Sequence, residues 1–469
     1  MLNLHNKSCL LIKYISVTIN GTGDNMYLGG VSGACNNKGT INSCKNTGEV
    51  SFYHVAGGSG AYPNIGGVVG YASAYINGCS NEGAVSFTTE GSSVTRPAVA
   101  GIAGYVAKNV DNCKNSGAIN VAGVKFAQAS YAKAAGTGGE IFPVFGGIAG
   151  CVGTAANGGK ADISNCTNSG NITVYAPGNT KARVGGIVGE PCGNVTNCDN
   201  SGDIDVTSGN QAYVAGIVGM YFYAANKVMS DCTNEGDIIH RQGDIAANNY
   251  HYVAGLVGSF QSSTTKFPIA NADDEQTGIA DYTGFTMNNC ENKGEVKSVA
   301  NLPTLIGGCF GTLRGTITNT YNYGAVISEG NHNTKKSAVA GFVGFAGGSA
   351  NNCGNYGDVT LTTTTTTNLA ASAFAGTIGG TVMTFTDITV DCDVTSNQLI
   401  ALLVAGQNGA KATTTLGTAE APIKVKSTTT LNGVAVTSEN LATTTIAAFL
   451  EEAYAANLLY TLGTTVVVE

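Results

Sequence analysis

Short stretches of alternating hydrophobic and polar residues recur along the chain. Ile204 and Val206 are apolar, whereas Asp203 and Asp205 beside them are polar. The same alternation appears at Val50/Phe52, Val85/Phe87, Ile119/Val121 and Ile172/Val174, with Ser51, Ser86, Asn120 and Thr173 between the apolar pairs. A period of two residues predicts half-buried β-strands with one face in the core and the other in solvent.

Two submotifs accompany the alternating stretches. The first has the form G-[VIL]-[VA]-G, with copies, some of them substituted, that start at Gly30, Gly67, Gly101, Gly147, Gly186, Gly216, Gly255, Gly308 and Gly341. The second is C-x-N-x-G, with copies that start at Cys44, Cys79, Cys113, Cys166, Cys198, Cys232, Cys290 and Cys353, and Thr320 replaces the cysteine in one further copy. Gly186 and Gly216 are 30 residues apart. A repeat of this length with three short strands predicts one coil of a parallel β-solenoid.

Two offsets within the repeat predict corners. Val195 and Cys198 are both apolar positions but lie three residues apart, as do Val184 and Ile187. A straight strand cannot turn both members of such a pair inward. We therefore expect a bend in each pair, which Gly186 would permit in the second. The Asn-x-Gly of each copy predicts a turn in which Asn tolerates left-handed geometry and Gly supplies a positive φ.

Stacking of the coils in register predicts two ladders of side chains. Identical side chains on stacked parallel strands can bond to one another along the stack. We expect an amide ladder and an inward-facing thiol ladder, formed by Asn81, Asn115, Asn168, Asn200 and Asn234 and by Cys79, Cys113, Cys166, Cys198 and Cys232.

The repeat divides the chain into three regions. Residues 1–27 are expected to form an N-terminal cap or the remnant of a leader, residues 28–394 the repeats, and residues 395–469 degenerate final coils and a C-terminal cap. In the cap, helical spacing of apolar residues predicts a short helix over Thr445–Tyr460, followed by a strand over Thr464–Val468. The prediction is an all-β chain: a right-handed parallel β-helix (β-solenoid) of about nine to ten coils with a small C-terminal cap.

Composition excludes several classes of protein. The 66 glycines and the charged fraction of 12% do not suit a helical repeat protein. The net charge is −8 and no Lys/Arg cluster occurs, so we expect no nucleic-acid partner. No apolar run reaches the 18 or so residues that a membrane span needs, so we expect no transmembrane segment. No small-residue cleavage site follows the apolar residues near the N-terminus, so no signal peptide is evident.

The 14 cysteines admit two interpretations. No C-x-x-C pair occurs, and the spacings follow the repeat rather than the geometry of metal ligands. The spacing favours a stack of buried free thiols that act as small hydrophobes. Metal or redox chemistry is the alternative interpretation, and we expect neither a metal nor a cofactor.

The repeat resembles the GLUG motif of bacterial cell-surface proteins. G-[GA]-[IVL]-[VA]-G, followed by a hydrophobic residue and x-N-C-x-N-x-G-[DEAN]-[IV], is present in full at 185–189 and 195–204, and similar copies cover residues 28–380. The resemblance implies an extracellular or cell-surface location in a bacterium and a place within a larger surface protein. Relatives with this motif include adhesins and IgA-specific metallopeptidases. The metallopeptidase signature H-E-x-x-H is absent, so that activity does not carry over.

Tyrosines in or beside the insertions between strands are the candidate ligand contacts. Exposed Tyr can stack on sugars or anchor a protein partner. The alternative is that these rings pack the insertions onto the solenoid. The candidates are Tyr131, Tyr221, Tyr223, Tyr250 and Tyr282.

Acidic residues offer a second kind of site. Asp203 and Asp237 follow the turn glycine and are expected about 5 Å apart in successive coils, where two carboxylates could flank a glycosidic bond. No Lys or Arg accompanies them in the repeat. Asp273-Asp274-Glu275 could contribute oxygen ligands to Ca²⁺, but it matches no Ca²⁺-loop spacing and is more simply a solvated loop.

These patterns favour a non-enzymatic adhesin or scaffold module, secreted or on the cell surface, that binds a glycan or a host or bacterial surface protein through insertion loops. A polysaccharide-processing enzyme, either a lyase or a hydrolase, is the alternative, because one fold can carry unrelated functions. An enzyme requires Asp/Glu and Lys/Arg side chains that converge in one groove, and a scaffold does not.

Overall fold

The computed structural model of this chain consists of two compact units. The first contains residues 1–223 and 232–248, and the second contains residues 224–231 and 249–469. The structure describes residues 14–20, 25–36, 39–55, 62–90, 94, 96–123, 126, 129–131, 139–141, 143–153, 161–178, 180–221, 226–244, 250–260, 284–301, 304–330, 337–364, 370–379, 382–407, 413–439, 460–462 and 466–469.

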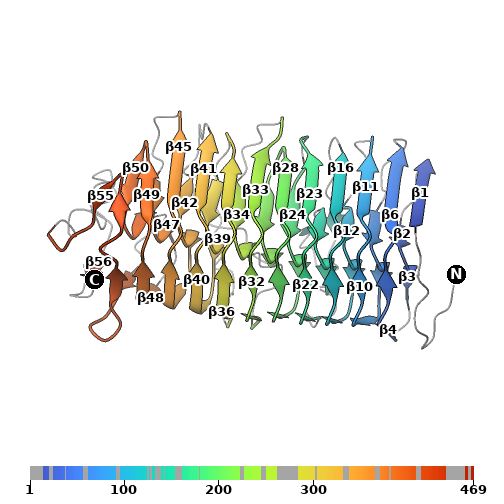
Figure 1. Cartoon of the computed structure of the whole chain (residues 1–469), viewed down its shortest axis with the longest axis horizontal. Coiled ribbons are helices and arrows are strands. Elements are labelled where there is room, and N and C mark those ends of the chain that lie inside the picture. The colour runs from blue at the N-terminus through green and yellow to red at the C-terminus, as the bar shows by residue number, and fades with distance from the viewer. Residues whose placement is uncertain are drawn as a thin grey trace. The chain divides into compact units, whose positions relative to one another are not determined.

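The first unit is built from four parallel sheets, here named A to D, in which strands of successive coils pair in chain order. Figure 1 shows this order for β6, β11, β16, β23 and β28. Sheet A contains β1 (Tyr14–Asn20), β6 (Glu49–Val55), β11 (Val85–Thr89), β16 (Ile119–Gly123), β23 (Ile172–Ala176), β28 (Ile204–Ser208) and β33 (Ile238–Gln242). Sheet B contains β2 (Asn25–Gly29), β7 (Tyr62–Gly66), β12 (Ala98–Ala100), β19 (Val144–Gly146), β24 (Ala182–Gly185) and β29 (Ala212–Ala215).

Sheets C and D complete the coils of the first unit. Sheet C contains β3 (Ser32–Cys35), β8 (Val69–Ala72), β13 (Ala103–Val106), β20 (Ala149–Val152), β25 (Val188–Pro191) and β30 (Val218–Tyr221). Sheet D has two short strands in most coils: β4 (Thr40–Asn42), β9 (Tyr75–Asn77), β14 (Val110–Asp111), β21 (Ile163–Ser164) and β26 (Val195–Thr196), then β5 (Lys45–Asn46), β10 (Ser80–Asn81), β15 (Lys114–Asn115), β22 (Thr167–Asn168), β27 (Asp199–Asn200) and β32 (Thr233–Asn234). An insertion adds the antiparallel pair β17 (Ala129–Tyr131) and β18 (Gly139–Ile141).

The second unit repeats the same plan. Its A strands are β37 (Val296–Val299), β41 (Val326–Gly330), β45 (Val359–Thr363), β49 (Asp393–Ser396) and β54 (Thr430–Leu431), and β55 (Val434–Ala435) pairs antiparallel with β54. Its B strands are β34 (His251–Ala254), β38 (Thr304–Gly307), β42 (Ala338–Ala340), β46 (Ala370–Ser372) and β50 (Leu399–Ala401), and its C strands are β35 (Val257–Phe260), β39 (Phe310–Leu313), β43 (Val343–Ala346), β47 (Ala375–Ile378) and β51 (Val404–Gln407). Its D strands are β31 (Val228–Ser230), β36 (Thr286–Asn292), β40 (Thr316–Asn322), β44 (Ser349–Asn355), β48 (Val382–Val390), β52 (Thr413–Leu416), β53 (Ile423–Val425), β56 (Tyr460–Leu462) and β57 (Val466–Val468).

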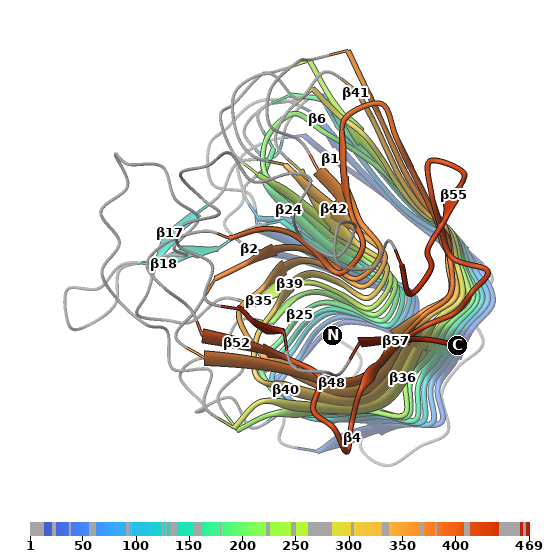
Figure 2. The same cartoon turned by 90° about the vertical axis from the view of Figure 1, so that its left-hand side faces the viewer.

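Each coil runs through sheets A, B, C and D in turn, as β23 to β27 do before β28 begins the next coil. In Figure 2, β6, β24, β25 and β4 of the first unit lie on separate walls of the coil. Sheet A follows the alternation in the sequence. Ile204 and Val206 are buried, and they pair in register with Ile172 and Val174 of the preceding coil. Apolar columns of this kind form the core.

The corner between the two D strands of a coil is a single residue in left-handed geometry. Asn197 has a φ of +50°. The equivalent residues Asn112, Asn165, Asp231, Asn289, Asn319, Asn352 and Asp387 have φ between +48° and +55°. Asn and Asp are among the few residues that tolerate this conformation without glycine's freedom. The predicted bend between Val195 and Cys198 is therefore confirmed. The assignment of positive φ to Asn200 and Gly202 is wrong, because neither residue has one.

Gly186 separates β24 from β25. Glycine is needed here because there is no room for a side chain, and its φ is not in the left-handed region. A Cβ at this residue would lie 2.0 Å from the carbonyl oxygen of Gly216 and 2.4 Å from Cγ of Asn200. Gly67, Gly101 and Gly147 face Asn81, Asn115 and Asn168 in the same way. The glycine-rich stretch is therefore pressed against the amide of the C-x-N-x-G stretch across the interior of the coil.

The structure confirms an all-β parallel solenoid, while the number of coils was underestimated. Among the described residues, sheet B has six strands in the first unit and five in the second, which gives eleven coils rather than nine or ten. The additional coils arise because β46 and β50 continue the array where the C-x-N-x-G pattern fades. The strand expected at Thr464–Val468 is present as β57, whereas residues 440–459, which include most of the expected helix, lie outside the described residues. In the described part, no helix has the length and hydropathy needed to cross a membrane.

Candidate functional site

The Asn of each C-x-N-x-G copy points into the coil, and these residues form an amide ladder within each unit. In the first unit, Nδ2 of Asn200 donates to the carbonyl oxygen of Gly202 (2.9 Å) and to Oδ1 of Asn234 (2.8 Å). Oδ1 of Asn200 accepts from Nδ2 of Asn168 (2.7 Å). The ladder runs through Asn46, Asn81, Asn115, Asn168, Asn200 and Asn234 in the first unit and through Asn292, Asn322 and Asn355 in the second. Each amide is satisfied within the fold, so the ladder stabilises the stack and offers no free group to a ligand.

The repeat cysteines also stack in the interior. Cys79, Cys113, Cys166, Cys198 and Cys232 are all buried and all free. Hydrogen bonds with neighbouring thiols raise the pKa of Cys79 and of Cys166 and lower the pKa of Cys113 and of Cys198, while burial acts upward at all four. Cys44 is an exception to the interpretation of free thiols, because it is disulfide-bonded. Among the described residues, no group of three or more His, Cys, Asp or Glu side chains is placed to hold a metal ion.

Two of the five tyrosines proposed from the sequence have described side chains, and both are buried. Tyr221, at the end of β30, has 0% of its surface exposed. Tyr250, which precedes β34, has 8% exposed, and burial raises its pKa to about 12. Neither ring presents a face to solvent. Tyr131 ends strand β17, but its side chain lies outside the described part of the chain, as do Tyr223 and Tyr282. The acidic run Asp273-Asp274-Glu275 also lies outside it.

The carboxylates proposed as a catalytic pair have structural partners. Oδ1 of Asp203 accepts a hydrogen bond from the backbone N–H of Asp237 (3.0 Å). Asp358 does the same for the backbone N–H of Asp393 (2.9 Å) in the second unit. One cation does lie close by, since Arg241 forms an ion pair with Asp205 on the outer face of sheet A. Asp203, Asp205, Asp237 and Arg241 thus come together on one exposed patch.

An exposed tyrosine cluster, formed by Tyr321, Tyr323 and Tyr356, lies on sheet D of the second unit. The rings of Tyr323 and Tyr356 are stacked, with centroids 5.1 Å apart and planes 13° apart. The Tyr321 ring lies 6.3 Å from each of the other two. Tyr323 has 44% of its surface exposed, and the other two side chains are half-buried. Three aromatic side chains thus meet on the outside of two successive coils.

The strand register explains why these rings meet. Tyr321 pairs with Gly354 of the next coil. A Cβ at Gly354 would lie 3.0 Å from Cε2 of Tyr356 and 3.3 Å from Cδ1 of Tyr321. Both rings therefore lean over the glycine. Tyr321 lies on β40, and Tyr323 and Tyr356 lie in the turns directly after β40 and β44. Because sheet pairing fixes these strands, the rings are held in place before any ligand arrives, which reduces the entropy cost of binding.

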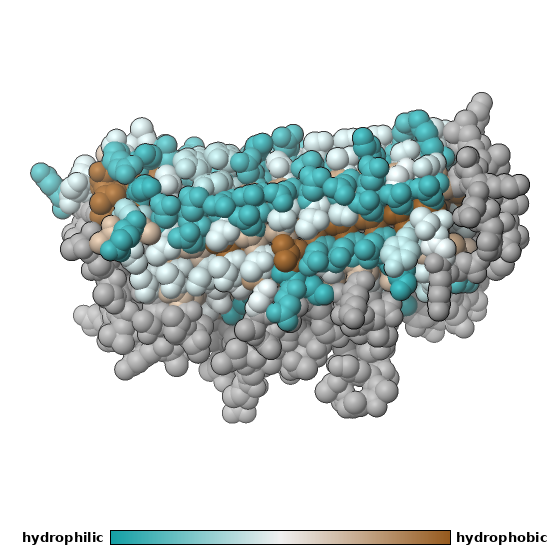
Figure 3. Space-filling view, turned by 90° about the horizontal axis from the view of Figure 1, so that it is seen from below, coloured by the Kyte–Doolittle hydropathy of each residue, from teal (hydrophilic) through white to brown (hydrophobic). Residues whose placement is uncertain are grey.

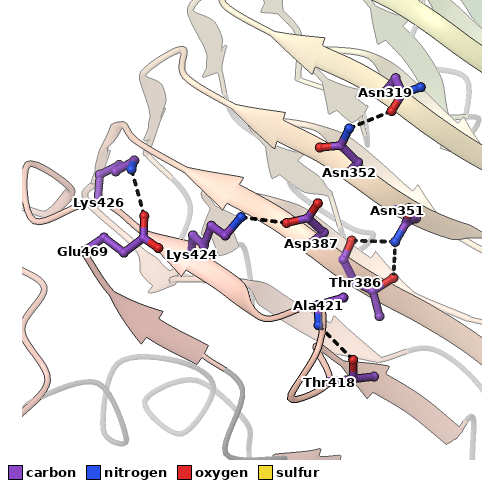
Figure 4. Close-up of polar contacts among 10 residues, drawn as sticks. All are labelled: Asn319, Asn351, Asn352, Thr386, Asp387, Thr418, Ala421, Lys424, Lys426 and Glu469. Atoms are coloured by element: carbon purple, nitrogen blue, oxygen red, sulfur yellow. Dashed lines mark hydrogen bonds and ion pairs between the residues drawn. The ribbon is translucent and has the colours of Figure 1, made fainter.

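Charged pairs border the tyrosine cluster on both sides along the stack. Lys293 pairs with Glu291 (3.2 Å) in the preceding coil. On the other side, Lys424 pairs with Asp387 (2.8 Å) and Lys426 with Glu469 (2.9 Å), as Figure 4 shows. The hydrogen bond to Asp387 raises the pKa of Lys424.

The corner residues add amides to this border. Nδ2 of Asn352 donates to Oδ1 of Asn319 (2.7 Å), and beyond the corner Nδ2 of Asn351 donates to Oγ1 of Thr386 (2.7 Å; Figure 4). Seen from below, hydrophilic side chains cover much of the described surface, beside a narrower hydrophobic stripe (Figure 3). The tyrosine cluster is therefore flanked by polar groups along the stack.

Tyr321 and Tyr323 stay neutral hydrogen-bonding groups at physiological pH. Burial raises the pKa of Tyr321, with the nearby Cys353 as the next cause. Burial also raises the pKa of Tyr323, helped by the negative charge of Glu291. Each phenol can therefore donate one hydrogen bond and accept others.

The candidate contacts predicted from the sequence lie in the insertions and do not include the three tyrosines of this cluster. The available signal was the variable residue of the N-x-G turn. Tyr323 and Tyr356 occupy it in two successive copies, where other copies have Thr47, Glu82, Ser116, Ser169 and Ser201. Two aromatic residues at one repeat position in adjacent coils must lie side by side once the fold is a solenoid.

Comparison with known proteins adds no further constraint. No protein-family model matches this chain, and neither the curated proteins nor the solved structures gave a match. The resemblance to the GLUG motif therefore stays a prediction from the sequence.

Proposed function

We propose that this chain is a non-enzymatic module of a secreted or cell-surface bacterial protein, an adhesin or scaffold, that binds a glycan or a surface protein. The observation that carries the proposal is the exposed tyrosine cluster on sheet D of the second unit. Tyr is enriched at binding surfaces because its ring buries a large apolar area with little loss of conformational entropy while its hydroxyl stays available for hydrogen bonding. The insertion loops, with Tyr131, Tyr223 and Tyr282, remain part of this proposal as further contacts.

The repeated fold supports such a role. Stacked coils offer a rigid surface whose side chains are spaced by the strand pairing, at about 4.8 Å per coil. A solenoid of this kind presents binding groups without an induced fit, as extended repeat surfaces generally do.

A polysaccharide-processing enzyme is the second candidate, favoured by the patch of Asp203, Asp205, Asp237 and Arg241 on the first unit. Carboxylates beside a cation are the groups that lyases and hydrolases need to move protons at a sugar ring. Against this, Asp203 is engaged with backbone and Asp205 with Arg241.

One experiment separates the two candidates. The purified chain is applied to an array of glycans and surface proteins, and the same polysaccharides are assayed for release of reducing ends and of unsaturated products. We expect binding without release. Release that disappears in Asp205→Asn, with Glu329→Gln as the control carboxylate on sheet A of the other unit, would establish the enzyme instead.

A further inference from the structure

The surroundings of the tyrosine cluster suit a sugar better than an apolar protein surface. Strand register places one residue of each successive coil in line with Tyr321 on the outer face of sheet D. This outward column consists of Glu291, Tyr321, Gly354, Thr389, Lys424 and Val467. One aliphatic side chain, Val467, occurs in that column, three coils beyond Gly354. The centre of a protein interface is usually fully desolvated and poor in charge. Here the aromatic rings lie directly between polar and charged side chains.

Aromatic rings between hydrogen-bonding groups match the two kinds of surface on a sugar. The C–H groups of a pyranose can pack on an aromatic ring, and its hydroxyls need donors and acceptors at the ring's edge. Those groups are supplied by the hydroxyls of the three tyrosines and of Thr389, and by the ion pair of Asp387 and Lys424.

The charges around the cluster point to an uncharged ligand. Lys293, Lys424 and Lys426 are each paired with a carboxylate, on Glu291, Asp387 and Glu469 respectively. An anionic polysaccharide would have to compete with these carboxylates for the lysines. A neutral chain can accept hydrogen bonds from the ammonium groups and donate to the carboxylates without breaking the pairs.

The length of the column points to several sugar units rather than one. Six register positions of the second unit, from Glu291 to Val467, span about 24 Å at about 4.8 Å per coil. The tyrosine cluster covers two of these coils and the ion pairs extend to both sides. The hydrogen-bonding groups therefore form a strip along the stack.

We infer that the tyrosine cluster and its flanking ion pairs bind an extended, uncharged oligosaccharide or polysaccharide that runs along the stacking direction of the second unit. This inference rests on the proposed function and specifies its ligand and its site. Tyr323 and Tyr356 hold the central sugar, and the Glu291–Lys293 and Asp387–Lys424 pairs bind hydroxyls of the sugars on either side.

The test uses the full chain with neutral probes, namely β-glucan, mannan and xylan, and with polygalacturonate as the anionic probe. Binding is measured by affinity electrophoresis, and then by calorimetry with oligosaccharides of one to six units of the polysaccharide that binds. We expect affinity to rise with length over several units and polygalacturonate to bind at least tenfold more weakly. Tyr323→Ala and Tyr356→Ala should each weaken binding about tenfold, the loss expected from one exposed stacking contact.

Tyr75→Ala is the matched control. Tyr75 is also 44% exposed on sheet D, but it lies in the first unit and outside the cluster. The inference is overturned if neutral chains bind Tyr323→Ala as tightly as wild type, if only polygalacturonate binds, or if a single sugar binds as tightly as a hexamer. If the wild-type chain binds glycans or proteins on the array and the tyrosine variants bind them with the same affinity, the inference is wrong and the proposed function still holds. A chain that binds nothing on the array sinks both.

Discussion

At the scale of single residues, the two submotifs of the repeat act as one unit because a glycine of the first packs on an amide of the second. The Cβ position of Gly186 lies 2.4 Å from Cγ of Asn200, and the same contact recurs between Gly308 and Asn322 in the second unit at 2.1 Å. A side chain at the glycine would displace the amide and open the ladder. This contact explains why the two stretches recur together, which neither stretch explains alone.

Replacing one ladder amide should destabilise the first unit substantially. Asn200→Ala removes the acceptor of Asn168 and the donor to Gly202 and Asn234, and it leaves buried polar groups unpaired. The expected loss is about 3 kcal/mol of unfolding free energy, since each buried unsatisfied group costs about 1–3 kcal/mol. Urea unfolding followed by circular dichroism measures it. Asn197→Gly, which removes an exposed corner amide while keeping left-handed geometry accessible, should cost less than about 1 kcal/mol. Equal losses in both variants would contradict a structural role for the inward amide.

The glycine should be as sensitive as the amide that it faces. Gly186→Ala would place a methyl group 2.0 Å from the carbonyl oxygen of Gly216, a contact that backbone cannot relieve without shifting the strand. We expect insoluble protein, or a loss of about 3 kcal/mol of unfolding free energy, the upper end of the usual range for overpacked interiors. Gly39→Ala is the control, because nothing lies within 4 Å of its added Cβ. A soluble Gly186→Ala protein with the wild-type unfolding midpoint would show that the coil is looser than the register implies.

At the scale of elements, the sequence was most informative where one face of a strand is buried. Ile204 and Val206 could be placed on a strand of sheet A with the correct inward face, because an alternating pattern specifies both the strand and its orientation. The corner could be located between Val195 and Cys198 from their odd spacing. The residue that forms the corner could not be identified from the sequence, because both Asn197 and Asn200 suit left-handed geometry. The inward position of the Asn200 amide in the structure decides between them.

The core of sheet A contains a buried histidine, His240, that should make the first unit sensitive to acid. His240 pairs in register with Val206, is fully buried, and lies 3.3 Å from the hydroxyl of Ser208. Burial, with the nearby Arg241 as a second cause, lowers its pKa to about 3. The folded state thus favours the neutral ring. The stability that depends on it is complete above the unfolded pKa of about 6.5 and is lost as the pH falls from there toward 3.

The size of this effect can be measured by comparison with a valine. Between pH 7.5 and pH 5.0, His240 should account for a loss of about 2 kcal/mol of unfolding free energy. His240→Val places at this position the residue that Val206, Val174 and Val121 supply in other coils. We expect the variant to lose about 2 kcal/mol less than wild type over the same pH range. Identical pH profiles would mean that the imidazole is hydrated or protonated in the folded protein.

At the scale of the whole chain, the candidate site was less predictable than the fold. The fold follows from inward positions, which repeat because every coil must fill the same interior. The tyrosine cluster follows from outward positions, such as Tyr321 and Tyr323, which the interior does not constrain and which therefore carry no periodic signal. Their significance depends on Gly354 of the adjacent coil, a residue that becomes their neighbour only through strand pairing.

The same division between inside and outside predicts how the cysteines of the chain react. The free cysteines on described residues are buried, except Cys35, which is half-buried. In the second unit, burial raises the pKa of Cys353 and of Cys392 to about 12, which keeps both thiols protonated and unreactive at neutral pH. A bulky thiol reagent at pH 7.5 should therefore label Cys35 first and the ladder cysteines only as the coils open. Mass spectrometry of labelled peptides, with Cys35→Ser as the control that removes the fast site, measures the order. If Cys166 and Cys198 are labelled as fast as Cys35 in native protein and no faster in urea, the thiols are not in the interior and the packing of sheet D against the core is wrong.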